Sequence, residues 1–204
     1  MRTATPLAGL AVALLVSGGC SAAPSNTPPA TGTGHTHATP ASGPGADDRT
    51  AVLLATASAQ DVAAAEAGGY ASTRDSLGCF QDPAQGGMGL HYLNASLLDD
   101  TVNIRQPEAY VYELAGDGTV AGLVALEYIV PVDAWTNVAP PELFGTAFHK
   151  HPTLPLWVLH VWLWKDNVNG AFADFNPAVR LCPAGVPIFG RDLPKPTRST
   201  PPGR

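Results

Sequence analysis

Four stretches of large apolar side chains lie between residues 89 and 164, and glycine, proline or polar residues separate them. These stretches are rich in Val, Tyr, Trp and Leu, which is typical of β-strands bounded by turns. The pattern predicts strands at residues 89–93, 109–114, 120–130 and 156–164.

The connections between these elements indicate how they are arranged. Gly116-Asp117-Gly118 separates the second predicted strand from the third and has the length and composition of a hairpin loop. No crossover helix is predicted between the strands, so we expect antiparallel pairing. Residues 50–67 are rich in alanine, follow Asp47-Asp48 and end at Gly68-Gly69, which predicts a helix. The predicted fold class is α+β, with an N-terminal helix packed on an antiparallel β-sheet or a small barrel.

The N-terminus has the layout of a bacterial secretory signal. Arg2 precedes an uncharged apolar run at residues 7–16, which is shorter than the roughly 20 residues needed to span a bilayer. The following segment, 14–20, resembles a lipobox, which predicts that Cys20 becomes the new N-terminus and carries a lipid. An ordinary signal peptide cut nearby is the alternative. Lipidation at Cys20 predicts a protein anchored to the cell membrane and facing its extracytoplasmic side.

The amino-acid composition changes along the chain and predicts where its segments begin and end. The segment after the lipobox consists mainly of Ser, Thr, Pro, Ala and Gly, which cannot bury enough apolar surface to fold. We therefore expect a signal peptide at 1–19, a disordered tether at 20–47, a single α+β domain at 48–183 and a Pro-rich tail at 184–204.

The cysteines and the charge narrow the class of protein further. With Cys20 lipidated, Cys79 and Cys182 remain, and in an oxidising compartment such a pair predicts a disulfide. Two free thiols in redox or metal chemistry are the alternative, although the chain has no C-x-x-C spacing. Asp and Glu number 17 against 11 Lys and Arg, and no basic stripe is present, so nucleic acid is not an expected partner.

Three polar side chains interrupt the apolar strands: His91, Glu127 and His160. Strict alternation along the third strand places Glu127 on the same face as Leu123, Ala125 and Ile129, and the opposite face is apolar as well. A buried carboxylate is costly unless it is paired, hydrogen-bonded or bound to a metal. No Lys or Arg interrupts these strands, so the sequence offers Glu127 few partners.

Two imidazoles and a carboxylate suit a divalent transition metal with open coordination positions. His149, in the loop before the last strand, is a candidate fourth ligand. The alternative is that His91 and His160 are core histidines and that Glu127 is hydrogen-bonded to the backbone or to Tyr110 or Tyr112. Four further residues are expected to line a pocket beside the candidate site: Trp162, Trp164, Asp174 and Asn176.

Several motifs, taken in order, resemble one family of exported bacterial proteins and lipoproteins from high-GC bacteria, for which no activity is established. These motifs are GGMGLHY, LEY, LFG followed by His149, HVWLW and FADFNP, and they extend over about residues 50–183. The resemblance implies that His91, Glu127, His149, His160 and the paired cysteines belong to a shared pattern. Phe175 stands where a tryptophan is commoner in that pattern.

Three functions remain open from the sequence. The first is an enzyme whose metal acts as Lewis acid or redox centre, with Glu127 as ligand or general base. The second is a non-catalytic lipoprotein that binds a metal or a small ligand. The third is a structural or interaction domain in which the histidines and Glu127 form a hydrogen-bonded core network.

Overall fold

The computed structural model describes residues 43–193, and the predicted signal peptide, Cys20 and most of the predicted tether lie outside them. The helical part is α1 (Ala46–Thr56), a 3₁₀ turn (Ala57–Gln60) and α2 (Val62–Ala67), where the sequence predicted one helix. The interruption lies at Asp61, which is extended and caps α2 by accepting a hydrogen bond from the Ala63 N–H at 2.9 Å. Gly69 then ends the helical segment with a φ of 92°, as expected for a helix stop. None of the described helices is long and apolar enough to cross a membrane.

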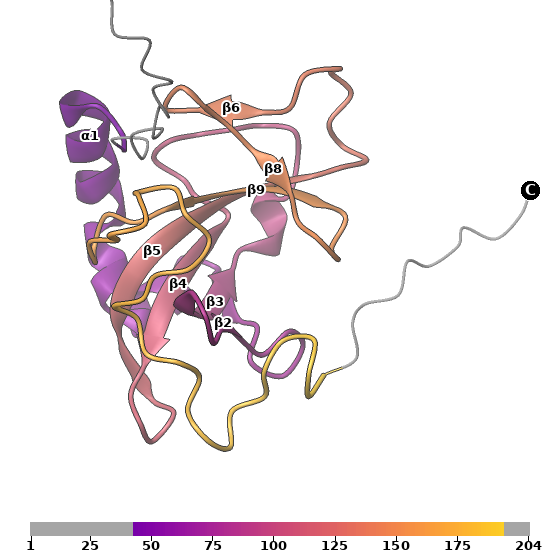
Figure 1. Cartoon of the computed structure of the whole chain (residues 1–204). Coiled ribbons are helices and arrows are strands. Elements are labelled where there is room, and N and C mark those ends of the chain that lie inside the picture. The colour runs from indigo at the N-terminus through magenta and orange to yellow at the C-terminus, as the bar shows by residue number, and fades with distance from the viewer. Residues whose placement is uncertain (1–42, 194–204) are drawn as a thin grey trace, which may run out of the picture. The chain divides into compact units, whose positions relative to one another are not determined.

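A seven-stranded antiparallel sheet forms the centre of the domain (Figure 1). The strand order is β1-β3-β4-β5-β9-β8, and β2 also pairs with β3. A two-stranded ribbon, β6 with β7, and a 3₁₀ turn (Ala95–Leu97) complete the described structure. The strands are β1 (Ala71–Ser72), β2 (Cys79–Asp82), β3 (Gly86–Leu93), β4 (Ala109–Leu114), β5 (Val120–Pro131), β6 (Glu142–Leu143), β7 (Thr146–Ala147), β8 (His149–Lys150) and β9 (Leu156–Val161).

The predicted α+β class and antiparallel pairing are confirmed. β3, β4, β5 and β9 are the four strands that the apolar stretches predicted, and the Gly116-Asp117-Gly118 loop joins β4 to β5. β9 ends at Val161, three residues before the predicted end, because the Trp162 N–H donates to the Ala171 carbonyl of a following loop. The sequence did not reveal the strands of two to four residues, which are too short to show an alternating pattern.

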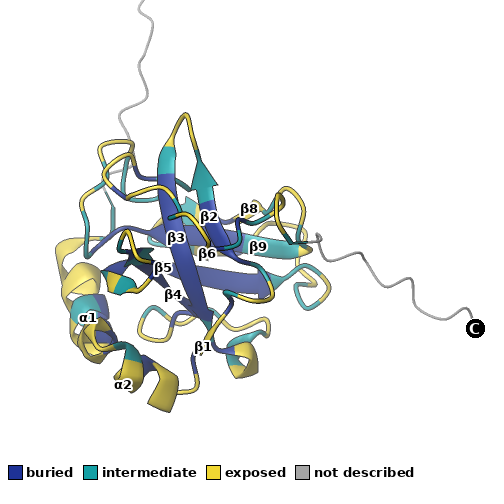
Figure 2. Cartoon of the chain, turned by 90° about the horizontal axis from the view of Figure 1, so that it is seen from below, coloured by how far each residue is buried: buried dark blue, intermediate teal, exposed yellow. Residues whose placement is uncertain are grey.

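The sheet has two buried faces (Figure 2). The face covered by α1 and α2, here called the helix side, carries the larger core cluster. The opposite face, here called the site side, carries two smaller clusters, one around Val111, Ala125 and Trp162 and one around Ala109, Ile129 and Val158. The helix-side cluster includes Val52, Tyr92, Tyr112, Leu126, Tyr128, Leu159 and Val161.

An irregularity in β5 changes which residues share the site side. Val111 pairs with Ala125 and its neighbour Tyr112 pairs with Leu123, so Val124 is an extra residue in β5. Leu123 consequently packs in the helix-side cluster and Val124 in a site-side cluster. The prediction that Leu123 shares a face with Glu127 was therefore wrong, because it assumed unbroken alternation.

The C-terminal part of the domain is held to the sheet in two ways. Cys79 and Cys182 form the predicted disulfide, with an S–S distance of 2.07 Å. Beyond it, the Cys79 N–H donates to the Pro187 carbonyl at 2.8 Å and the Phe189 N–H donates to the Cys79 carbonyl at 2.9 Å. Packed structure thus continues past residue 184, where the sequence analysis placed the start of the tail.

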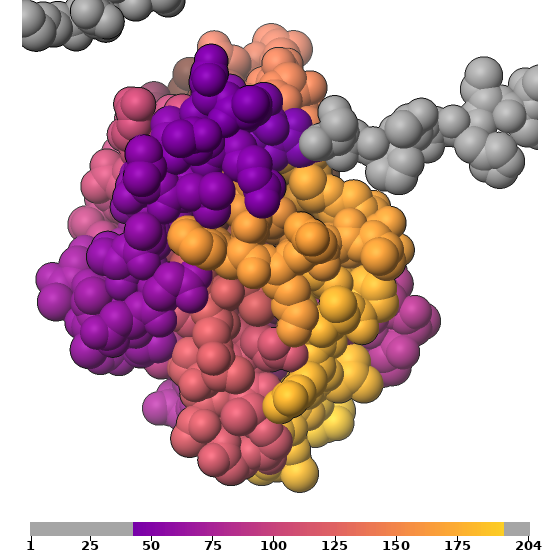
Figure 3. All heavy atoms as spheres, turned by 90° about the vertical axis from the view of Figure 1, so that its left-hand side faces the viewer, coloured from indigo at the N-terminus to yellow at the C-terminus, as the bar shows by residue number. Residues whose placement is uncertain are grey.

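The segment after β9 also reaches the helices. Figure 3 shows it in orange beside the indigo α1, where the Arg49 guanidinium donates to the Leu163 carbonyl at 3.5 Å.

Candidate metal centre

Three strands supply the side chains of the candidate metal centre. Glu127 on β5 pairs directly with His160 on β9, so their side chains leave neighbouring strands on the same face. His91 lies on β3, and β4 separates it from β5. Ala109 of β4 is the residue opposite Glu127, and its short side chain leaves room for the carboxylate to reach across to the histidine.

The three predicted residues converge. His91 Nε2 lies 3.2 Å from Glu127 Oε2, and His160 Nε2 lies 3.4 Å from Glu127 Oε1. One ligand atom from each residue can be chosen so that all three lie within 4.8 Å of one another. The residues are 5 %, 6 % and 2 % exposed for His91, Glu127 and His160, so the group is shielded from solvent.

Asp174 fixes the orientation of His160. The His160 Nδ1 lies 3.2 Å from Asp174 Oδ1, which makes this nitrogen the natural donor of the ring. His160 Nε2 then points towards Glu127 Oε1, 3.4 Å away. A carboxylate that holds one imidazole nitrogen while the other faces a metal is a recurring arrangement at metal centres.

Two buried ring nitrogens of the centre have no hydrogen-bond partner among the described residues. They are His91 Nδ1 and His160 Nε2, the second of which lies within ion-pair distance of Glu127 Oε1 but makes no hydrogen bond; the third such buried atom is the indole nitrogen of Trp164. Buried polar atoms in proteins are nearly always hydrogen-bonded, so an exception at a functional cluster requires an explanation. A cation between His160 Nε2 and the Glu127 carboxylate would contact both of these groups at once.

The charges of the centre favour an ionised Glu127. Burial alone raises the pKa of this carboxyl, but the neighbouring His160 and His91 outweigh burial and lower the pKa to about 2. Burial disfavours a charged His160, whereas Glu127 and Asp174 favour it, and the net effect is a raised pKa for His160. Asp174 is partly buried, yet hydrogen bonds with His149 and His160 hold its pKa well below the usual range.

His149 is placed outside this group of three ligand atoms. Its Nε2 lies 3.2 Å from Asp174 Oδ1, and 45 % of its side chain is exposed. The structure thus arranges His149, Asp174 and His160 in a row that leads from the surface to the buried carboxylate. In this arrangement His149 contacts Asp174, the residue that also contacts the candidate ligand His160.

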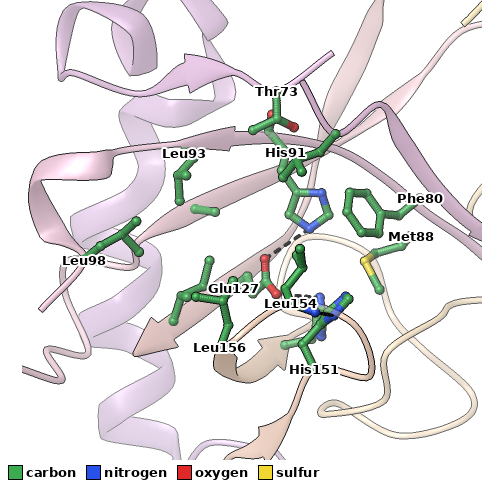
Figure 4. A pocket seen from close by; sticks show the side chains of 14 residues that line it. Thr73, Phe80, Met88, His91, Leu93, Leu98, Glu127, His151, Leu154 and Leu156 are labelled. Atoms are coloured by element: carbon green, nitrogen blue, oxygen red, sulfur yellow. Dashed lines mark hydrogen bonds and ion pairs between the residues drawn. The ribbon is translucent and has the colours of Figure 1, made fainter. Parts of the chain in front are cut away.

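Two cavities adjoin the centre. The first has a volume of about 60 Å³, and its polar lining is Thr73, His91, Glu127, His151 and His160 within a wall of apolar side chains. The second has a volume of about 170 Å³ and is more polar. Figure 4 shows the first cavity, with His91 and Glu127 joined by a dashed line and Phe80 and Met88 beside them. Four residues line both cavities: Phe80, Met88, His151 and His160.

The four residues predicted to line a pocket have separate positions. Asp174 lines the second cavity. Trp162 packs in a site-side cluster and donates its indole N–H to the Ala173 carbonyl, whereas Trp164 packs against the helix-side cluster. Asn176 is fully buried and holds a turn, since its amide donates to the Asp166 carbonyl and accepts from the Ala178 N–H.

Sequence reasoning missed His151, Phe80 and Met88 as residues of the centre. Met88 lies three positions before His91, and Phe80 follows Cys79, so neither carries a signal beyond its apolar character. His151 was visible as the second histidine of His149-Lys150-His151, but only the turn after β8 directs it to the cavities. The alternative partner Tyr112 is excluded, because its hydroxyl donates to the Ala59 carbonyl on the helix side.

Comparison with protein-family models, with curated proteins and with solved structures gave no match. The interpretation of the centre therefore depends on its own geometry.

Proposed function

We propose that this protein is an extracytoplasmic metal-binding lipoprotein, anchored to the cell membrane through Cys20. Its buried site, His91, Glu127 and His160, takes one divalent transition metal ion. The observation that carries the proposal is the convergence of two buried imidazoles on one buried carboxylate: His91 Nε2 and His160 Nε2 lie 3.2 Å and 3.4 Å from the Glu127 oxygens, while Asp174 contacts the other ring nitrogen of His160.

The donor set favours particular metals. Two imidazoles and one carboxylate with open positions are used for Fe(II) in oxygenases and for zinc in hydrolases. Both metals leave at least one coordination position for water or a small molecule. His91, Glu127 and His160 all line the first cavity, so a metal ion held by them would be accessible to a small ligand in that cavity.

Elemental analysis of the untagged protein, followed by titration with Fe(II), Zn(II), Mn(II) and Co(II), tests the proposal. We expect close to one metal ion per chain in the parent and none in a His91→Ala/His160→Ala double variant. A His35→Ala/His37→Ala variant is the matched control, because it removes two histidines from the predicted tether, and it should leave the stoichiometry unchanged. Circular dichroism shows whether each variant is folded.

Glu127→Gln provides a second variant that keeps the size of the side chain. It should lower metal affinity strongly while the protein stays folded. If the folded parent binds none of these metals, or if Glu127→Gln and the double variant bind as the parent does, the metal site is refuted. The histidines and Glu127 would then be a hydrogen-bonded core network.

A further inference from the structure

The side chain of His151 is held in one tautomer by the turn that follows it. The backbone N–H groups of Thr153 and Leu154 both donate to His151 Nδ1, at 3.2 Å and 3.0 Å. A nitrogen that accepts two hydrogen bonds cannot also carry a proton, so the ring proton lies on Nε2. His151 therefore offers a hydrogen-bond donor and no lone pair on its free edge.

The position of His151 makes this donor relevant to the centre. Its side chain belongs to the wall shared by both cavities, together with Phe80, Met88 and His160. Figure 4 places His151 on the side of Glu127 away from His91. His151 is not part of the group whose ligand atoms lie within 4.8 Å of one another. Because its free nitrogen bears a proton, His151 is suited to contact a molecule bound at the metal rather than the metal itself.

The charge and size of the first cavity define that molecule. A divalent ion with Glu127 as its charged ligand leaves one net positive charge, and no other Asp, Glu, Lys or Arg among residues 43–193 lines this cavity. Asp174 lines the second cavity and is held by His149 and by the opposite ring nitrogen of His160. A net charge in an apolar cavity is costly, so a single negative charge on the ligand is favoured. A cavity of about 60 Å³ holds only a few heavy atoms.

Building on the proposed metal site, we infer that its open position takes a small monoanion of about two to four heavy atoms, of the size of azide or formate. His151 donates its Nε2–H to this anion and is thus a residue that determines ligand specificity. The apolar wall excludes larger carboxylates.

The experiment uses the full-length protein loaded with Co(II), whose visible absorption reports changes in coordination, and azide, formate and benzoate as probes. Metal content is measured in every sample. The parent is expected to change its spectrum with azide and with formate, and to show no change with benzoate.

His151→Phe, which removes the donor, should bind one Co(II) but weaken azide binding at least about tenfold, since hydrogen bonds to charged groups are among the stronger ones. His151→Gln, whose amide N–H₂ can take the place of Nε2–H, should restore azide binding to within about threefold of the parent.

The outcomes separate the two proposals. A folded parent that binds no Co(II) refutes the metal site and this inference with it. A parent that binds Co(II) but neither azide nor formate, or that binds benzoate as tightly as azide, refutes only the small monoanion. Equal azide affinity in His151→Phe and the parent refutes the role of His151. A loss of metal from both His151 variants would show instead that His151 is needed for the metal and not for the anion.

Discussion

The two faces of the same sheet treat buried polar atoms differently. On the helix side, the hydroxyls of Tyr70, Tyr112 and Tyr128 each donate to a backbone carbonyl, at 2.7 Å, 2.7 Å and 2.6 Å. The indole nitrogen of Trp164 is the exception on this side, because it is buried without a hydrogen-bond partner among the described residues. On the site side, His91 Nδ1 and His160 Nε2 are buried without a hydrogen-bond partner among the described residues. Strands β3, β4 and β5 contribute to both faces, so the difference arises from the side chains and not from the backbone.

We infer from this contrast that the helix side mainly stabilises the fold and that the site side mainly serves the proposed metal binding. A fully satisfied polar group contributes to one well-defined core, whereas an unsatisfied one lowers stability unless a ligand completes it. We therefore expect helix-side substitutions to change the free energy of unfolding and leave metal binding intact. Substitutions at the centre should instead reduce metal binding and leave the free energy of unfolding of the metal-free protein almost unchanged.

Leu126→Ala should produce the largest effect and tests the helix-side half of the contrast. Leu126 is fully buried in the helix-side cluster, and its truncation should lower the free energy of unfolding by about 2–5 kcal/mol. Urea unfolding measures the loss, and metal stoichiometry is measured at low urea, where the variant is folded. If the folded Leu126→Ala protein bound no metal, stability on the helix side and metal binding on the site side would not be independent.

Glu108 provides a test that depends on pH. Burial raises the pKa of this carboxyl to about 8, and its Oε2 accepts the Ile129 N–H at 2.8 Å. The folded state therefore keeps a proton that the unfolded state loses between pH 4.5 and about 8, so stability falls as the pH rises through this range. The expected slope is up to about 1.4 kcal/mol per pH unit.

Glu108→Gln keeps the acceptor for Ile129 and cannot ionise, so the metal-free variant should lack this part of the pH dependence. The exposed Glu142→Gln serves as the control and should follow the parent. Parallel stability curves for the parent and Glu108→Gln between pH 5 and 8 would contradict the raised pKa.

Asp174→Asn is the sharpest test on the site side. The substitution removes the charge that orients His160 through Nδ1, and loss of such a contact typically lowers metal affinity about 10–100-fold. Competition titration with a chelating dye measures the affinity, and Asp100→Asn, an exposed acid, is the control. An affinity unchanged by Asp174→Asn would mean that His160 is oriented by its packing alone.

Tyr112→Phe should have a smaller effect, confined to stability. It removes the hydroxyl that donates to the Ala59 carbonyl, which should lower the free energy of unfolding by about 0.5–1.5 kcal/mol. The metal affinity should stay at the parent value. A shift of that affinity would show that the helix side is coupled to the centre.

His149→Ala should have the smallest effect. His149 contacts Asp174 and lies outside the ligand group, so metal affinity should fall by less than about threefold, within about 0.6 kcal/mol. A loss comparable to that of His160→Ala in the same titration would restore His149 as a ligand.

The long strands were predictable from their apolar stretches, and these stretches make the interrupting polar residues His91, Glu127 and His160 conspicuous. The hairpin followed from Gly116-Asp117-Gly118, and the disulfide followed from the number of cysteines. The sequence could not show that His91 reaches Glu127, because that contact depends on the registers of β3 on β4 and of β4 on β5. The bulge at Val124 leaves no mark in the composition, so alternation misplaced Leu123. Asp174 and Asn176 look alike in the sequence, and only their contacts separate an orienting residue from a turn residue.

The most direct test of the metal site is an anomalous difference map from crystals of the zinc-loaded protein, collected above and below the zinc absorption edge. We predict one strong peak about 2 Å from His91 Nε2, from a Glu127 oxygen and from His160 Nε2. A peak at His149 and Asp174 with none at Glu127, or no peak in the domain, would contradict it.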